Sequence, residues 1–564
     1  MLKIYQGREN VDKEKFIYEH TEGETLVIVP NQYTLVAEEQ ALKYLNTSCL
    51  LNVEILSMNR LGLRMLQEQG TDNVRMLDRY ERYMLLARII RNREKQLDIF
   101  RTAAGKRNFV DMVHDFIADF RQQECTREEL EEILADPETD ELLRKKIREL
   151  SGILEEYESL VQGKYKDVED YVDLYTDAIG KSRELAGKTV WVYGFDSMTA
   201  KFVRSLTEIA GVARNVYVMV NRTDFGLEDV LIRSIRRSAE EKGLTVSVET
   251  LTGDVLEKSE TLKRIEQGLF TQSDKTKIAS ADFRPADLQV VECANLYNEA
   301  ENAAIQVYNL LHRGYRMKDI VIICNDTEKM QPIVERTFRE YGLPLFRDAR
   351  RSIRDSQVVG FVMNLLEICS GGYRTPAVMA LLKSGLTGLE REAIWNLENY
   401  ARDFGIKGSM WTKPFKYGDF EYDPEEFAKL EESRVEITGR IEQLKVLAEE
   451  SERMADFIEK FYRYLNEVWD LRNKIREIED GQYNRERFEE AQWTAQSYNE
   501  VVRILGCVGN IMGDEAMDLK EFVDLYSVGI LNAEVGLIPP TQDGLTMGVM
   551  IRTRPAPPKV VMVL

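Results

Sequence analysis

Histidines and long hydrophobic runs are scarce in this sequence, and each scarcity excludes a class of protein. The 564 residues include three histidines, which lie far apart along the chain. A zinc site or a Ser-His-Asp triad is therefore not expected. No run of eighteen apolar residues occurs, so we expect no membrane-spanning helix. Charged residues occur within the first ten positions, which argues against a secretory signal.

Cysteine and positive charge are also limited. The six cysteines lack the spacing of metal ligands, which is typical of reduced thiols in a cytoplasmic protein. Acidic residues outnumber Lys and Arg by 97 to 76, and the formal net charge is −21. Such a surface as a whole repels nucleic acid, so DNA binding requires a local basic groove. We expect a cytoplasmic protein without a metal site.

The sequence does contain short apolar segments separated by helical stretches. Such segments are typical of strands buried on both faces of a parallel sheet. One expected set of strands is 2–5, 25–30, 53–58, 189–195 and 215–221, and a second is 288–294, 319–325 and 560–564. Residues 295–316 are predicted to form a crossover helix within the second set. The pattern predicts an α/β protein with two parallel-sheet cores.

A long helical insertion is expected in each core. The first core is predicted at residues 1–59 and 186–280, with a helical insertion at 60–185. The second is predicted at 281–354 and 536–564, with a helical insertion at 355–535. The sequence stops on the apolar segment 560–564, whereas a natural terminus is usually solvated. We therefore expect the second core to be incomplete and further sequence to follow Leu564.

The segment after the first expected strand looks like a phosphate-binding loop with key residues changed. The pattern G-x-x-x-x-G-K-[ST], counted from Gly7, places Lys13 at the lysine position. Asp12 then replaces a glycine, and Glu14 replaces the hydroxyl residue that binds magnesium. Both carboxylates repel a triphosphate, and Asp12 carries a Cβ where a positive φ is expected. Gly7 and Lys13 are thus candidates for a degenerate nucleotide site, and the favoured interpretation is a core that does not hydrolyse ATP.

Five blocks of sequence carry a resemblance to a known family. They are VPNQYTLVAEEQAL (29–42), VEILSMNRLGLRML (53–66), VWVYGFDSMT (190–199), GYRMKDIVIIC (314–324) and NLENYARDFGIKGSMWTK (396–413). In this order the chain resembles AddB, the second subunit of the bacterial AddAB helicase–nuclease, from its first strand to Leu564. The resemblance implies two RecA-like cores of a superfamily-1-like helicase. This chain departs from the family at its phosphate loop and at Tyr193, where members commonly carry an acid, so ATP and Mg²⁺ are not expected ligands.

The resemblance also implies a function. The family's N-terminal half has largely lost motor activity and scans single-stranded DNA for the Chi recombination hotspot, beside an AddA-type motor and nuclease. The intact complex resects double-strand breaks. The family's nuclease and its 4Fe-4S cluster would lie beyond Leu564. We therefore expect a DNA-binding repair subunit with no catalytic residue and no cofactor in this chain, and with an AddA-type subunit and single- and double-stranded DNA as partners.

Candidate DNA contacts follow the second expected strand, where matching family positions line the Chi-recognition channel. Gln32 and Thr34 offer hydrogen bonds, and Tyr33 offers a stacking face. The alternative for this segment is a plain strand-to-helix turn with Thr34 as the helix N-cap.

Further candidates follow the third and fourth expected strands. Arg60 suits a phosphate or a guanine edge. Met58 and Leu63 stand where the family has aromatic residues that stack on bases, so weaker stacking is expected here, and core packing is the alternative for both. Phe195 is a further candidate at the end of the fourth strand.

The segment 59–107 is locally basic, with twelve Lys or Arg and six Asp or Glu. Such a segment suits a phosphate path. The alternative is a solvated helix face with partner acids, such as a pair between Asp78 and Arg82. The arginines concerned are Arg75, Arg79, Arg82, Arg88, Arg91 and Arg93.

Two other functions stay open. One is an active ATP-dependent DNA helicase, which would bind an ATP analogue. The other is a structural scaffold for the AddA-type motor that reads no DNA. The family is an ATP-dependent helicase and exodeoxyribonuclease, and we expect neither activity from this chain alone.

Overall fold

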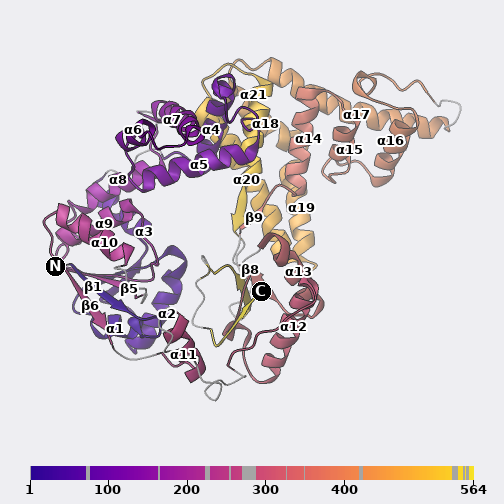
Figure 1. Cartoon of the computed structure of the whole chain (residues 1–564). Coiled ribbons are helices and arrows are strands. Elements are labelled where there is room, and N and C mark those ends of the chain that lie inside the picture. The colour runs from indigo at the N-terminus through magenta and orange to yellow at the C-terminus, as the bar shows by residue number, and fades with distance from the viewer. Residues whose placement is uncertain are drawn as a thin grey trace.

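Two parallel sheets organise the computed structural model of the chain (Figure 1). It describes all residues except 1, 71–75, 163–164, 223–228, 253–255, 270–286, 325–326, 348–349, 418–422, 537–543, 551–552 and 554–557. The α/β class with two parallel-sheet cores is confirmed. No helix within the described ranges is long and apolar enough to cross a membrane.

The first sheet has six parallel strands in the order β3-β2-β4-β5-β1-β6. Alternate residues of its central strands enter opposite cores, as the pleat requires. Val190 and Val192 of β4 pack with α3, α8, α9 and α10, whereas Trp191 packs with α1 and α2 on the other face. The strands are β1 (Leu2–Gly7), β2 (Thr25–Ile28), β3 (Val53–Leu56), β4 (Thr189–Val192), β5 (Asn215–Asn221) and β6 (Val246–Leu251). The helices are α1 (Lys13–Glu19), α2 (Thr34–Tyr44), α3 (Met58–Glu68), α8 (Val168–Ile179), α9 (Ala200–Val212), α10 (Val230–Glu241) and α11 (Glu260–Leu269).

The second sheet has four parallel strands in the order β12-β7-β11-β8. The helix predicted at 295–316 is confirmed as α12 (Leu296–His312), which packs against α13 (Thr327–Glu340) and the sheet, but within the described residues no strand of this sheet precedes it, so the predicted crossover between two strands is not found. The strands are β7 (Ile320–Ile323), β8 (Leu345–Arg347), β11 (Leu545–Gly548) and β12 (Val560–Val563). A separate antiparallel ribbon joins β9 (Arg350–Ser352) to β10 (Glu534–Gly536).

The strand predicted at 288–294 is wrong. Residues 288–293 belong to no strand, and Val290 is 93% exposed. A β-strand requires a neighbouring strand to pair its backbone groups, and no described strand pairs with this segment. The apolar pattern was therefore present without the pairing that makes a strand.

The first insertion consists of helices that follow β3. They are α4 (Arg79–Arg93), α5 (Arg107–Gln122), α6 (Arg127–Ala135) and α7 (Glu141–Val161). The second insertion consists of α14 (Gln357–Gly371), α15 (Thr375–Leu382), α16 (Arg391–Asp403), α17 (Pro424–Glu449), α18 (Met454–Glu467), α19 (Leu471–Tyr483), α20 (Phe488–Met512) and α21 (Leu519–Leu531). Short 3-10 helices include η1 (Asn31–Tyr33), η2 (Glu94–Gln96), η5 (Met317–Asp319) and η6 (Gly408–Met410).

The two insertions pack against each other through α4. Its residues Tyr80 and Met84 belong to the core of the second insertion, whereas Leu86 and Ile89 belong to the core of the first. A Cβ on Gly529 of α21 would lie 2.4 Å from Met84 Cε, so the helices touch closely. One helix therefore takes part in both cores and joins the two insertions into one body.

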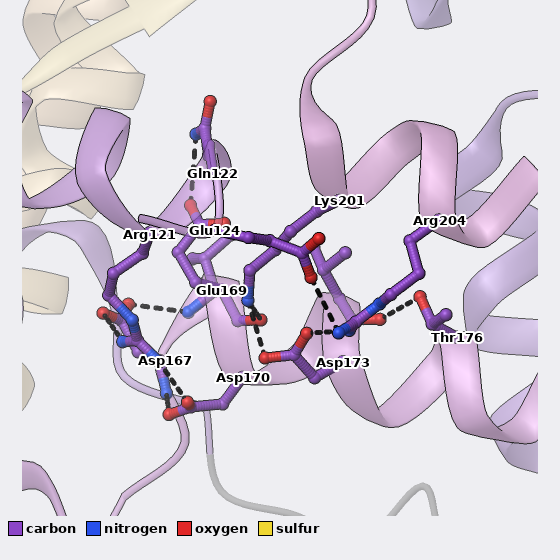
Figure 2. Close-up of polar contacts among 12 residues, drawn as sticks. Arg121, Gln122, Glu124, Asp167, Glu169, Asp170, Asp173, Thr176, Lys201 and Arg204 are labelled. Atoms are coloured by element: carbon purple, nitrogen blue, oxygen red, sulfur yellow. Dashed lines mark hydrogen bonds and ion pairs between the residues drawn. The ribbon is translucent and has the colours of Figure 1, made fainter. Parts of the chain in front are cut away.

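A polar network fixes the first insertion to the helices of the first sheet (Figure 2). Arg121 of α5 pairs with Asp167 and Asp170 at the start of α8. Lys201 of α9 donates to Asp173 of α8, with 2.6 Å between Nζ and Oδ2. The ion pairs are partly or fully buried, so solvent screens them less than pairs on an open surface.

Candidate nucleotide pocket and nucleic-acid interface

A cavity of about 790 Å³ lies at the carboxyl ends of β1 and β4, where the first sheet faces the second. Its lining comes from the β1–α1 loop, α2, the β4–α9 loop and Pro558, which precedes β12. Such an edge is where ligands bind in open α/β sheets. The predicted phosphate-loop residues therefore lie where a nucleotide site is expected.

Asp12 serves as a helix cap. Its Oδ1 accepts from the backbone N–H of Lys15 at 3.0 Å, and its Oδ2 accepts from the Tyr44 hydroxyl at 3.0 Å. The expectation of a positive φ at this position is wrong, because φ is −75°. The loop thus has an ordinary Asx-capped entry into α1, and its carboxylate remains beside the cavity.

The side chain of Lys13 points back towards the backbone of the β1–α1 loop. The side chain is 5% exposed, and Nζ donates to the carbonyl of Arg8 at 2.8 Å. Burial lowers the pKa of this ammonium. Gly7 ends β1 beside it, and a Cβ there would lie 3.6 Å from Lys13 Cε. The structure thus brings Gly7 and Lys13 together, with the ammonium already donating to backbone.

Glu14 occupies the position of the magnesium-binding hydroxyl and is buried. The Tyr33 hydroxyl donates to its carboxylate. Burial raises the pKa of Glu14, although the Tyr33 hydrogen bond opposes the shift. With Asp12 and Glu14 both beside the cavity, the donor set does not fit a magnesium-bound triphosphate.

The β4–α9 loop supplies no acid at Tyr193 or Gly194. Tyr193 packs edge-on against Tyr33, with 6.2 Å between ring centroids. Gly194 has φ +85°, and a Cβ there would lie 3.2 Å from Pro30 Cδ. The tight turn after β4 therefore requires glycine where a helicase needs a carboxylate.

The candidate DNA contacts after β2 separate into two groups. Gln32 is exposed on η1. Tyr33 turns towards Glu14 and lines the cavity. Thr34 begins α2 and donates from Oγ1 to the carbonyl of Asn31 at 3.2 Å, so the alternative of Thr34 as an N-cap is wrong.

After β3, Ser57 caps α3 by accepting from the backbone N–H of Arg60 at 3.4 Å. The Arg60 side chain is exposed and makes no hydrogen bond or ion pair within the described ranges. Met58 is 5% exposed and packs in the core, which is the alternative given for it, whereas Leu63 is 46% exposed. Phe195 lines the cavity and packs on Phe202, with 4.8 Å between ring centroids.

Gln32 and Arg60 occupy equivalent places on neighbouring strands. β2 and β3 are parallel, and Ile28 pairs with Leu56. Each candidate follows its pairing residue by four positions, so η1 with Gln32 and the first turn of α3 with Arg60 lie at the same edge of the sheet. Exposed Leu35 lies on the first turn of α2 beside them. Leu35 was missed because one leucine at a helix start gives no sequence signal of exposure.

Four of the six candidate arginines in the basic segment 59–107 form ion pairs with carboxylates. The alternative of a charged face with partner acids is therefore the better description, although the proposed Asp78–Arg82 pair is not the one formed. The pairs join Arg82 to Asp167, Arg88 to Glu515, Arg91 to Asp524, Arg93 to Glu156 and Arg503 to Asp78. Arg79 lies over the Tyr83 ring at 5.8 Å, and Arg75 lies outside the described residues.

Comparison with known proteins gives consistent matches. Residues 7–266 match the family model described as "ADDB, N-terminal". The chain is similar to an ATP-dependent helicase/deoxyribonuclease subunit of Alkaliphilus metalliredigens, at 25% identity over 98% of this chain and 50% of the relative. It is similar to the protein of the same name from Alkaliphilus oremlandii at 27% identity, over 98% and 51%. The chain spans about half the length of the curated relatives it matches.

Proposed function

We propose that the chain, whose residues 7–266 match the AddB N-terminal family model, is a helicase-like DNA-binding subunit of an AddAB-type helicase–nuclease. In this proposal it binds and scans single-stranded DNA during repair of double-strand breaks and does not hydrolyse ATP. The division into RecA-like cores at the boundaries given above remains a prediction. An AddA-type helicase–nuclease partner and a cytoplasmic location are parts of the same proposal.

The contact between Lys13 and the carbonyl of Arg8 is the observation that supports loss of the motor. A phosphate-binding lysine must offer its N–H groups to the ligand. Here one N–H group of Lys13 already donates to the backbone carbonyl of Arg8. The carboxylates of Asp12 and Glu14 flank Lys13 in the sequence and line the same cavity. Binding a triphosphate would require a buried ammonium to be released and two negative charges to be overcome.

The shared core of the two insertions gives independent support. A helicase motor must change the relative position of its two nucleotide-binding cores during each cycle. In this chain α4 packs with both insertions, and ion pairs such as Arg88–Glu515 cross between them at 2.8 Å. This packing between the insertions opposes such movement, and it favours two cores that keep a fixed position relative to each other.

The exposed side chains of Gln32 and Arg60 support single-strand binding. Arg60 on the first turn of α3 offers a guanidinium with no described partner, and Gln32 offers an amide on η1, which follows the adjacent strand. These groups suit phosphates and base edges. Met58 is buried and Leu63 is aliphatic, so base stacking at this edge is weak. We infer that contacts to the DNA phosphate backbone contribute most of the affinity and that the sequence specificity is reduced.

The test is a fluorescence-anisotropy titration of the chain with a labelled single-stranded oligonucleotide at several salt concentrations. Arg60→Ala should weaken binding and reduce the slope of log affinity against log salt by about 0.7, the value for one phosphate on a single strand. Arg237→Ala, on an 86% exposed side chain of α10, is the matched control. An unchanged slope in Arg60→Ala would contradict the contact.

Two outcomes would favour the other functions. DNA-stimulated ATP hydrolysis that Lys13→Ala abolishes would show an active helicase. Absence of single-strand binding by the folded chain would favour the scaffold, which the neutralised arginines of α4 also support.

A further inference from the structure

The last turn of α16 and the segment that follows it towards α17 display cations without ion-pair partners among the described residues. Arg402, Lys407, Lys413 and Lys416 are exposed, and none forms an ion pair within the part of the chain that the structure describes. Between residues 402 and 417 the one acidic residue is Asp403, so four positive charges less one negative give +3. This local excess stands out in a chain with a net charge of −21.

Three of the four cations on neighbouring α17 pair with acids of the same helix. Arg434 pairs with Glu431, Arg440 pairs with Glu436, and these pairs have N···O distances of 2.7 and 2.6 Å. Pairing along the same helix is the usual arrangement of a solvated face. The four cations of 402–417 thus differ from most of those on α17, where exposed Lys429 alone among the four forms no ion pair with a described residue.

Buried side chains hold this segment in a defined shape. Ile406, Trp411 and Phe415 are 2%, 1% and 6% exposed. The guanidinium of Arg434 donates to the carbonyl of Trp411 at 2.9 Å, and the backbone N–H of Phe415 donates to Glu431 at 2.6 Å. The cations thus project from an anchored backbone, which lowers the entropy cost of binding a ligand.

Two exposed aromatic rings accompany the cations. Tyr417 is 54% exposed and lies nearly parallel to Phe404, with 6.2 Å between centroids. Trp395 is 55% exposed and precedes Arg402 by seven residues on α16, which places both on the same helix face. Cations interleaved with exposed rings are typical of surfaces that hold a nucleic-acid backbone.

The composition favours DNA over an acidic protein as the occupant. Three of the four cations are lysines, which are depleted in protein–protein interfaces, whereas lysine and arginine are the usual phosphate contacts. The residues between them include exposed Ser409 and Thr412, whose hydroxyls also suit phosphate oxygens.

We propose that residues 402–417, together with Trp395, form an arm platform that binds the phosphodiester backbone of DNA. Figure 1 shows α15, α16 and α17 extending away from the rest of the chain, remote from the first sheet that carries Gln32 and Arg60. The chain would then hold DNA at two separate places. This inference rests on the proposed DNA-binding function and adds a second contact to it.

The test compares two variants of the whole chain with equal loss of charge. The arm variant carries Arg402→Gln, Lys407→Gln, Lys413→Gln and Lys416→Gln. The control carries Lys145→Gln, Arg237→Gln, Arg336→Gln and Arg463→Gln, all at exposed ion-paired positions. Circular dichroism establishes that both are folded. Each is titrated with labelled duplex and single-stranded DNA of equal length over a range of salt.

We expect the arm variant to lose at least about tenfold in affinity for one DNA form at low salt. Its salt slope should fall by about 0.9 for each duplex phosphate lost, or about 0.7 for each on a single strand. The DNA form that is affected identifies the strand bound by the arm platform. If the arm variant matches the control while Arg60→Ala still weakens binding, the arm platform is overturned and the proposed function stands. If the parent chain binds no DNA, both are overturned.

Discussion

Tyr33 and Glu14 join the loop after β2 to the start of α1, because the phenol donates a hydrogen bond to the buried carboxylate. Burial raises the pKa of Glu14, so the folded state holds this proton more tightly than the unfolded state does. The free energy of unfolding contributed by Glu14 therefore falls as pH rises through the unfolded and then the folded pKa. Ionised Glu14 costs stability at neutral pH.

The first prediction concerns Glu14→Gln. The amide keeps the acceptor for Tyr33 and removes the buried charge, so the midpoint of thermal unfolding should rise at pH 7 to 8. The gain should shrink as the pH approaches 4, where Glu14 of the parent chain is protonated. Glu131→Gln on exposed α6 is the control. A gain that is the same at pH 4 and pH 8 would contradict the burial argument.

A second prediction concerns the buried pair of Arg82 and Asp167. Burial alone would raise the pKa of Asp167, but the charges and hydrogen bonds of Arg82, Tyr157 and Arg121 outweigh it and lower the pKa. Arg82→Leu leaves a buried carboxylate without its main partner and should cost about 3–5 kcal/mol in urea unfolding. Arg127→Leu, at an exposed pair with Glu158, should cost less than about 1 kcal/mol.

The same pair predicts acid sensitivity. Since the folded pKa of Asp167 lies below the unfolded value, the stabilisation is complete above the unfolded pKa and is lost as pH falls through the folded one. The difference in stability between the parent chain and Asp167→Asn should therefore narrow below about pH 4. A difference that stays constant down to acid pH would mean that the charge of Asp167 is not what matters.

A third prediction concerns the joint between the insertions. A Cβ on Gly529 would lie 2.4 Å from Met84 Cε and 2.6 Å from Ile504 Cγ2, and both side chains are fully buried. Gly529→Val should overpack the joint and cost about 1–3 kcal/mol. Gly506→Ala on α20 has nothing within 4 Å of its Cβ and should stabilise by up to about 1 kcal/mol. Equal effects from the two substitutions, measured by urea unfolding, would refute the close contact.

A fourth prediction links packing to DNA binding. A Cβ on Gly62 would lie 2.5 Å from the Tyr175 ring, so Gly62→Ala should push α3 away from α8. Because α3 carries Arg60, single-strand affinity should fall together with stability. Gly211→Ala on α9 meets nothing within 4 Å, so it should leave the affinity unchanged and should not lower the stability. If Gly62→Ala lowers the stability but leaves the single-strand affinity unchanged, the position of α3 does not matter for DNA binding, which contradicts a contact between Arg60 and DNA.

Seven strands could be predicted because each is a continuous or nearly continuous apolar run bounded by turn residues. β7 reads Ile-Val-Ile-Ile and is buried throughout. β6 was missed because, as an edge strand, it mixes Ser, Glu and Thr with apolar residues. β11, Leu-Thr-Met-Gly, is too short and mixed to give a pattern. Segment 288–294 had the pattern but lacks a described neighbour.

The candidate site was predictable only in its loop. The spacing from Gly7 drew attention to Lys13, which lines the cavity, since a phosphate loop is defined by local sequence. The partners of that loop come from elsewhere: Tyr33 follows β2, and Pro558 precedes β12. The partners of the α4 arginines were equally hidden, because Glu515 lies more than 400 residues from Arg88. Contacts at such separations depend on the tertiary fold and leave no periodic signal.

Because α4 belongs to the hydrophobic cores of both insertions, the chain cannot be cut between its two halves without exposing one face of this helix. A recombinant piece ending near residue 280 would strip away the partners of Tyr80 and Met84 and leave that apolar side of α4 in water. A piece beginning there would lose the same helix from its own interior. We therefore expect either half, produced by itself, to aggregate or to be degraded, and neither to fold as an autonomous unit.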